Sequence, residues 1–377
     1  MFKRTLSATL ANKLGRGKAI ILVGPRQVGK TTLINELLKS KKFLFLNADD
    51  PVTRQILTNP STDQLKTLLG TYTLVFLDEA QRIPNIGLTL KIITDQFKAV
   101  QLLVSGSSSF ELGNQLNEPL TGRKWEYQLY PISWEELEDE VGYINAEQQL
   151  ENRLLYGFYP DVLNHKGEEV EVLRQLVNSY LYKDILAMAN LRKPQVLEKL
   201  VQALALQIGS EVSFNELAQL VGVDKNTITN YIQVLEQAFI IFRLGSYSGN
   251  LRNEIKTSRK VYFYDVGVRN AIIGNFSALE LRQDKGALWE NFLIAERLKQ
   301  NAYQQSLAKM YFWRTTRQQE VDLIEEEAGN IAAYEFKWKS KGNTRFPKAF
   351  LSAYNPETKI ITRENFREFV GLENFEK

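Results

Sequence analysis

The chain has 377 residues, 44% of them hydrophobic and 24% charged, a length and composition that predict two or three folded domains. It contains no cysteine and a single histidine, His165, which excludes disulfides, thiolate zinc sites and histidine-clustered metal sites. The net charge of +3 permits contact with nucleic acid but does not argue for it. No apolar run reaches the length of a membrane span and no signal-peptide core opens the chain, so we expect a cytoplasmic protein without membrane contact.

Short apolar runs alternate with helical stretches between Lys18 and Pro131. The runs are AIILVG, FLFLN, TLVFLDE, QLLVSG and WEYQLYPI. Apolar runs separated by amphipathic segments are typical of a parallel sheet that helices cover on both faces. The sequence therefore predicts an α/β domain over residues 1–132.

Three further parts are predicted after this domain. Helical periodicity from Ser133 to about Lys193 indicates a helical subdomain over residues 133–193. Residues 195–238 contain three helical segments, and the runs FIIFRLGSYSG and KVYFYDV behind them indicate two strands that flank a basic turn, which together predict a unit over 194–270. From Gly286 onward we expect the order helix, strand, strand, helix and terminal strand, in a last unit over 271–377.

A phosphate-binding loop lies between the run AIILV and the helical segment KTTLINELL. Residues 24–31, GPRQVGKT, match the full Walker A pattern, in which glycines let backbone N–H groups surround the phosphates of ATP. Lys30 should reach the β- and γ-phosphates, and the Thr31 hydroxyl should bind Mg²⁺. The alternative is a chance glycine-rich turn. The predicted nucleotide-binding residues are Gly24, Pro25, Arg26, Gln27, Val28, Gly29, Lys30, Thr31, Thr32, Asp78 and Ser107.

Two acidic residues end the apolar run TLVFLDE. Asp78 is expected at the carboxyl end of its strand, where open α/β sheets place ligands, and should hold Mg²⁺ together with Thr31. Glu79 is the candidate catalytic residue that orients or deprotonates the attacking water, the alternative being a surface carboxylate. Ser107, after the run QLLVSG, either hydrogen-bonds the γ-phosphate or its water or belongs to an ordinary serine turn.

Two helical segments joined by a short turn and followed by strands predict a winged helix-turn-helix in the middle of the chain. Polar residues that open its second helix could enter a groove of DNA, and basic residues around the following strands could contact phosphates. The alternative is a spacer between protein partners. The candidate nucleic-acid contacts are Lys225, Asn226, Arg252, Lys256, Arg259 and Lys260.

A second acidic constellation lies near the C-terminus. Asp322 is expected on one strand, and Glu335 and Lys337 two residues apart on the next, so the latter two share a face. An acid on one strand and E-x-K on the next can bind Mg²⁺ or Mn²⁺ and activate water for phosphodiester cleavage, with Lys337 as a catalytic residue and Glu290 as a further metal ligand from the preceding helix. The alternative is alternating polar residues on an exposed sheet face.

The order of these motifs resembles a family of prokaryotic AAA-type ATPases whose C-terminal half is a domain of unknown function similar to PD-(D/E)xK nucleases. The segments that carry this resemblance include GPRQVGKTT, FLDEAQRIP, LTGRKWEYQLYPISWEE, KVYFYDVGVRNAIIG and YEFKWKS. The resemblance implies a P-loop NTPase domain of AAA+ type with a helical subdomain, a winged helix-turn-helix and a restriction-endonuclease-like α/β domain. It also implies that Arg123 is a catalytic finger reaching the nucleotide of a neighbouring subunit in a homo-oligomer, with a structural salt bridge as the alternative.

Two hypotheses about function follow. In the first, ATP hydrolysis with Mg²⁺ drives DNA handling by a motor or nuclease in replication, repair, recombination or defence. In the second, the chain is a nucleotide-dependent signalling switch whose winged-helix and nuclease-like parts serve only as binding modules.

Overall fold

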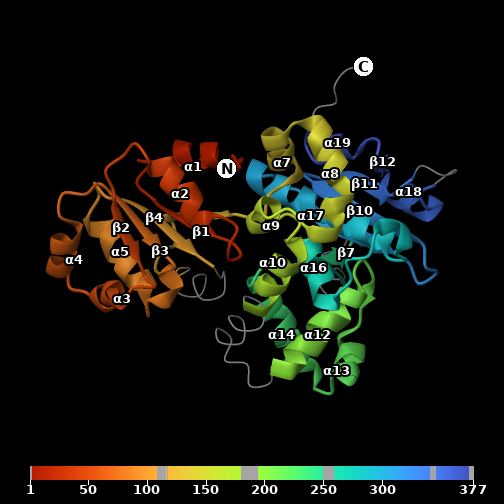
Figure 1. Cartoon of the computed structure of the whole chain (residues 1–377), viewed down its shortest axis with the longest axis horizontal. Coiled ribbons are helices and arrows are strands. Elements are labelled where there is room, and N and C mark those ends of the chain that lie inside the picture. The colour runs from red at the N-terminus through yellow and green to blue at the C-terminus, as the bar shows by residue number, and fades with distance from the viewer. Residues whose placement is uncertain are drawn as a thin grey trace. The chain divides into compact units, whose positions relative to one another are not determined.

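The computed structural model describes residues 2–107, 116, 118–179, 194–248, 259–339 and 345–372. The chain divides into two compact units, drawn together in Figure 1. The first unit comprises Met1–Ile132 and Gln237–Phe239, and the second comprises Ser133–Glu236 and Ile240–Lys377. Within the described part of the chain, no helix has both the length and the apolar character needed to cross a bilayer.

The N-terminal unit is built on a five-stranded parallel sheet with the order β2-β3-β4-β1-β5. Its strands are β1 Ala19–Val23, β2 Leu44–Asn47, β3 Leu74–Asp78, β4 Gln101–Gly106 and β5 Lys124–Gln128. Each of the five apolar runs named above forms one of these strands, which confirms the predicted α/β class with a parallel sheet. The helices of this unit are α1 Leu6–Lys13, α2 Lys30–Leu38, α3 Pro51–Leu57, α4 Thr62–Leu69, η1 Ala80–Arg82 and α5 Ile86–Gln96.

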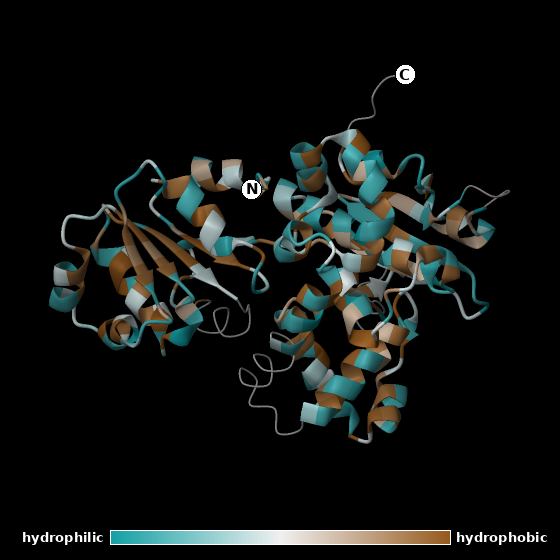
Figure 2. Ribbon diagram, in the orientation of Figure 1, coloured by the Kyte–Doolittle hydropathy of each residue, from teal (hydrophilic) through white to brown (hydrophobic). Residues whose placement is uncertain are grey.

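Burial explains why the central strands β1 and β4 are mostly apolar without alternation. Every residue of β1 and β4 is buried, as expected for central strands covered on both faces. Figure 2 shows the strands of this sheet largely in brown, the colour of hydrophobic residues, and Figure 1 shows α1 and α2 together on one side of it. Because parallel strands end at the same edge, Val23, Asp78 and Gly106 bring the loops behind β1, β3 and β4 close together.

Helices open the C-terminal unit, as the periodicity after Ser133 predicts. They are α7 Trp134–Val141, α8 Tyr143–Tyr156, α9 Pro160–Asn164 and α10 Glu169–Leu176. The helices that follow are α12 Pro194–Leu206, α13 Phe214–Val221, α14 Lys225–Gln237, α16 Val266–Ile273, η3 Leu279–Leu281, α17 Lys285–Gln304, α18 Lys348–Tyr354 and α19 Phe366–Phe369.

A mixed seven-stranded sheet organises this unit, with the order β12-β11-β10-β9-β7-β8-β6. Its strands are β6 Glu211–Val212, β7 Ile241–Ser246, β8 Arg259–Phe263, β9 Lys309–Arg314, β10 Glu320–Glu327, β11 Asn330–Phe336 and β12 Glu357–Ile361. Strand β9 and helix α19 add to the element order expected after Gly286. Helix α17 lies against β8 and β11.

The structure does not separate the segments on either side of residue 270. Strand β7 pairs in parallel with β9, with Gly245 opposite Tyr311, so one sheet continues across the predicted boundary. Residue 270 itself lies inside α16. Strands β7 and β8 are antiparallel and follow α13 and α14, but their role as the wing of a DNA-binding domain stays a prediction.

Asp265 joins the C-terminal end of α8 to the N-terminal end of α16. Its carboxylate is buried and accepts hydrogen bonds from the backbone N–H of Phe158 at 2.7 Å and of Val268 at 3.0 Å. The second contact caps α16. The two backbones approach so closely that a Cβ atom on Gly267 would lie 2.1 Å from the carbonyl oxygen of Tyr156. A glycine is therefore required at this crossing.

Candidate functional site: the P-loop

The loop between β1 and α2 turns back over the end of the sheet. Gln27 and Gly29 have positive φ angles of 62° and 91°, which bend the loop just before α2 begins at Lys30. A Cβ atom on Gly24 would lie 2.1 Å from the carbonyl oxygen of Leu129, so only glycine fits where the loop leaves β1. These restraints explain why Gly24 and Gly29 of the Walker A pattern are glycines, while phosphate binding by the loop stays a prediction.

Lys30 is buried and points into the loop. Its Nζ donates hydrogen bonds to the carbonyl oxygens of Gly24 at 2.9 Å and Pro25 at 2.7 Å. Burial lowers the pKa of Lys30 to about 8, although the carboxylates of Glu79 and Asp78 act in the opposite direction. The lysine is thus held by neutral carbonyl groups, which a triphosphate would replace with a much stronger acceptor.

Thr31 and Asp78 lie next to each other although 47 positions separate them. The Thr31 hydroxyl donates to Asp78 Oδ2 at 2.8 Å, and the Ser105 hydroxyl donates to Asp78 Oδ1. A hydroxyl and a carboxylate on adjacent elements are hard oxygen donors of the kind that Mg²⁺ takes beside nucleotide phosphates. The residues therefore fit the predicted magnesium site.

Glu79 is held by two polar neighbours rather than exposed to solvent. Gln81 Nε2 donates to Glu79 Oε2 at 2.6 Å and to the hydroxyl oxygen of Ser107 at 2.9 Å, and the Ser107 hydroxyl lies 3.3 Å from Glu79 Oε2. Glu79 itself has a positive φ of 53°, an uncommon conformation that is often found at functional sites. Ser107 is thus brought to Glu79, and Gln81 is a site residue that sequence analysis missed.

Arg4 holds the P-loop through hydrogen bonds to backbone carbonyl groups. Its guanidinium is buried and donates to the carbonyl oxygen of Val28 at 2.7 Å and of Tyr130 at 2.6 Å. It therefore joins the P-loop to the segment that follows β5. No motif near Arg4 indicates this role, because its contacts lie 24 and 126 positions away.

The remaining predicted nucleotide contacts surround the loop at different depths. Pro25 and Val28 are buried, Arg26 is half-buried, and Gln27 and Thr32 are exposed. This range suits a loop that presents its backbone, rather than its side chains, to phosphates.

Arg123 lies beside an acidic residue of its own unit. Its Nε is 2.6 Å from Asp95 Oδ1 on α5, and both side chains are partly exposed. This is the salt bridge considered as the alternative to a finger, so the catalytic role of Arg123 stays a prediction.

The predicted nucleic-acid contacts do not form one exposed patch. Lys225 and Asn226 are exposed at the start of α14, and Arg259 is half-buried. Arg252 and Lys256 lie outside the described residues. The prediction is wrong for Lys260, which is only 1% exposed and is ion-paired to Glu290 and Glu320. It sits on the inward face of β8, a position that local charge alone does not reveal.

The C-terminal constellation does come together in space. Lys337 Nζ lies 2.8 Å from Glu335 Oε2 and 3.8 Å from Asp322 Oδ2, and burial together with Asp322 raises the pKa of Glu335. Burial also raises the pKa of Glu290 to about 7. Yet the described residues contain no group of three or more acidic or histidine side chains arranged to hold a metal ion. The predicted second Mg²⁺ or Mn²⁺ site on Glu290, Asp322 and Glu335 therefore does not fit this geometry.

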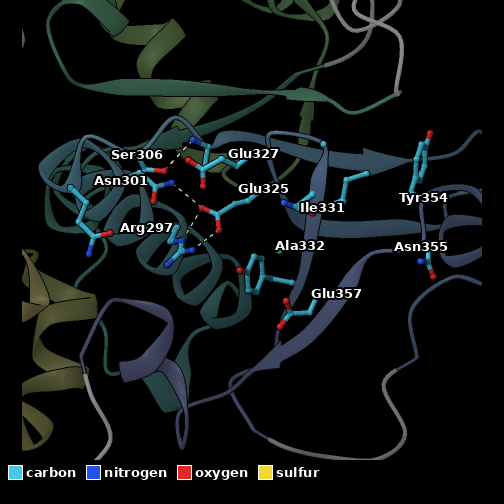
Figure 3. Close-up of a pocket in the computed structure, with 15 residues that line it drawn as sticks. Arg297, Asn301, Ser306, Glu325, Glu327, Ile331, Ala332, Tyr354, Asn355 and Glu357 are labelled. Atoms are coloured by element: carbon cyan, nitrogen blue, oxygen red, sulfur yellow. Dashed lines mark hydrogen bonds and ion pairs between the residues drawn. The ribbon is translucent and has the colours of Figure 1, made fainter.

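A polar pocket of about 680 Å³ lies beside β10, β11 and α17 (Figure 3). Its inner wall is the ion pair between Arg297 and Glu325, joined at 2.6 Å, and Asn301 also donates to Glu325 at 2.8 Å. These three side chains therefore satisfy one another.

Comparisons with known proteins agree with this assignment. Residues 16–138 match a family model described as an AAA domain, and residues 147–279 and 285–371 match two domains of unknown function, DUF8612 and DUF4143. A solved structure, the Walker-type ATPase paby2304 of Pyrococcus abyssi, aligns with a TM-score of 0.52 at 16% identity and covers 72% of this chain and 96% of its own. Together, the parallel sheet and the P-loop are those of an AAA-type P-loop ATPase fold.

The relatives are proteins without an assigned activity. An uncharacterized protein of Mycobacterium tuberculosis, Rv2008c, is 30% identical over 340 residues, which cover 89% of this chain and 74% of the relative. An uncharacterized protein of Haemophilus influenzae is 22% identical, over 94% of this chain and 91% of its own. The chain belongs to the same family as Rv2008c.

Proposed function

We propose that the chain hydrolyses ATP at the P-loop of its N-terminal unit. One observation supports this most directly. Thr31, at the start of α2, donates to Asp78 at the end of β3, and the next residue after Asp78 is Glu79. Nucleotide, cation and water would therefore meet at one edge of the sheet.

Each residue has a distinct task in this proposal. Lys30 would turn from the carbonyl groups of the loop to the β- and γ-phosphates. Thr31 and Asp78 would hold Mg²⁺, which when bound neutralises charge on those phosphates. Glu79 would orient the attacking water and take its proton, as the water oxygen bonds to the γ-phosphorus and the bond to ADP breaks.

Phosphate release from ATP and Mg²⁺ by the purified chain tests the proposal. Lys30→Ala should lose most nucleotide binding and all hydrolysis, because the phosphates lose their buried cation. Glu79→Gln should bind nucleotide and not turn it over. Lys39→Ala, which removes an exposed lysine just beyond α2, should behave as wild type. Hydrolysis by Glu79→Gln within a few fold of wild type would remove Glu79 from the proposed role.

We also propose that hydrolysis serves DNA handling, with the nucleotide-dependent switch as the alternative. The exposed Lys225 and Asn226 at the first turn of α14 support DNA contact, although the burial of Lys260 weakens the basic patch. We do not extend the proposal to DNA cleavage, because the cation site that cleavage needs does not fit.

Hydrolysis measured with duplex, single-stranded and branched DNA separates the two. Stimulation that falls in Lys225→Ala, with a salt slope lower by about one unit, supports DNA handling. Lys199→Ala, an exposed lysine on α12, is the matched control. Slow turnover with tight nucleotide retention and no response to any DNA would favour the switch.

A further inference from the structure

Four acidic side chains gather on two strands and one helix of the C-terminal unit. We refer to Glu290, Glu320, Asp322 and Glu335 as the carboxylate cluster; they lie on α17, β10 and β11. Like charges this close repel one another unless cations neutralise them. The cluster therefore needs a positive partner.

The chain supplies that partner from β8. Lys260 Nζ lies 3.1 Å from Glu290 Oε1 and is also ion-paired to Glu320. Glu320 has a second cation, Arg314, whose Nε is 3.4 Å from Glu320 Oε2. On the other side of the cluster, Lys337 pairs with Glu335 and Asp322.

The carboxylate oxygens face protein donors. Glu290 Oε1 accepts from Lys260 and from the Tyr262 hydroxyl at 2.7 Å. Asp322 Oδ2 accepts from the backbone N–H of Phe336 at 2.8 Å. A divalent cation would have to displace the Lys260 ammonium group to reach Glu290 Oε1.

Lys260 is less free than Lys337 to move away from the carboxylate cluster. The Lys337 side chain is 41% exposed and could turn into solvent, whereas that of Lys260 is 1% exposed. Lys260 Nζ also lies 5.5 Å from the centre of the ring of Phe312, a residue of β9. Withdrawing this ammonium would require β8 to open.

We propose that Lys260 is the resident cation of the carboxylate cluster and occupies the place that a divalent metal would otherwise take. The cluster then joins β8, α17 and β10 without metal. The inference does not depend on ATP hydrolysis, because it concerns residues of the C-terminal unit alone.

The test measures Mn²⁺ binding to the full chain, by calorimetry and by electron paramagnetic resonance of free Mn²⁺. An Asp78→Asn parent removes the competing P-loop ligand. We expect no saturable Mn²⁺ binding to the parent and no rise in its Tm with Mn²⁺. Adding Lys260→Met should lower the Tm without metal, create one Mn²⁺ site and allow Mn²⁺ to raise the Tm. Arg259→Met, which removes the preceding half-buried charge, should create no site.

Two results would overturn the proposal. One is a single saturable Mn²⁺ site in the parent that Glu290→Gln removes. The other is a folded Lys260→Met protein that binds no Mn²⁺. If Lys260→Met does not fold, the double variant Lys260→Met with Glu320→Gln removes opposite charges together and should recover folding. A double variant that stays unfolded, combined with Mn²⁺ binding by the parent, also contradicts the proposal.

Discussion

Arg123 Nε lies 2.6 Å from Asp95 Oδ1, so the arginine expected to act on another subunit's nucleotide has a partner within its own unit. The contact is partly exposed, and solvent screening leaves an ion pair of this kind with little net effect on stability. Such a pair can break at little cost, so it leaves both roles for Arg123 testable.

Paired variants distinguish a finger from a salt bridge. If Arg123 is a finger, Arg123→Ala should lower turnover by roughly a thousandfold with little change in nucleotide affinity, and Asp95→Ala should leave turnover near wild type. If the pair is only structural, both variants should cause the same small loss of stability and none of turnover. Turnover per subunit that does not vary with protein concentration, where monomers dominate, would exclude action between subunits.

Nucleotide affinity should depend on pH through Lys30. The pKa of Lys30 is about 8 without nucleotide, down from 10.5, and phosphates favour the ammonium form. Affinity should therefore be full below about pH 8 and fall up to about tenfold per pH unit above it, since binding then requires uptake of a proton. Titration of a fluorescent ATP analogue from about pH 7 to about pH 9.5 measures this. The affinity of Lys30→Met should be weak and flat over the range; a flat wild-type profile would mean that Lys30 stays protonated throughout.

Gln81 should act as a positioning residue for Glu79. Its amide nitrogen donates to the Glu79 carboxylate at 2.6 Å, and its buried Oε1 has no hydrogen-bond partner among the described residues. Gln81→Ala should lower kcat by about tenfold or more, a part of the ~10²–10⁴-fold that a positioned base contributes, and leave KM nearly unchanged. Any residual hydrolysis by Glu79→Gln, measured with enzyme in excess over ATP, should not fall further when Gln81→Ala is added. An equal loss in both backgrounds would show that Gln81 acts independently of Glu79.

The crossing of α8 and α16 should tolerate no added methyl group. Gly267→Ala would place its Cβ 2.1 Å from the Tyr156 carbonyl oxygen, and we expect it to destabilise the protein by about 1–3 kcal/mol or more. Gly286→Ala meets no atom within 4 Å in the first turn of α17, and should be neutral or stabilising by up to about 1 kcal/mol. Urea unfolding of both variants measures the difference, and equal midpoints would contradict the described crossing.

Sequence analysis predicted the features that depend on residues close to one another along the chain. The Walker A loop, Asp78 at the end of its strand and the five parallel strands all follow from local patterns of glycine and apolar residues. Gln81 and Arg4 were missed because their partners are chosen by the fold: an amide two residues after Glu79 and an arginine before α1 carry no local signal. The prediction for Lys260 was wrong for the same reason, since the sequence does not tell whether a lysine in a strand faces solvent or two partly buried glutamates.

The pairing of β7 with β9 determines which fragments of the chain can be studied alone. A fragment ending near residue 270 would expose the edge of β7, and one beginning near 285 would expose the edge of β9. Open edges of this kind recruit strands from other molecules, so both halves should aggregate when expressed separately. A fragment that begins at Ser133 keeps the seven strands together with the helices of the same compact unit, so a soluble preparation of it is expected.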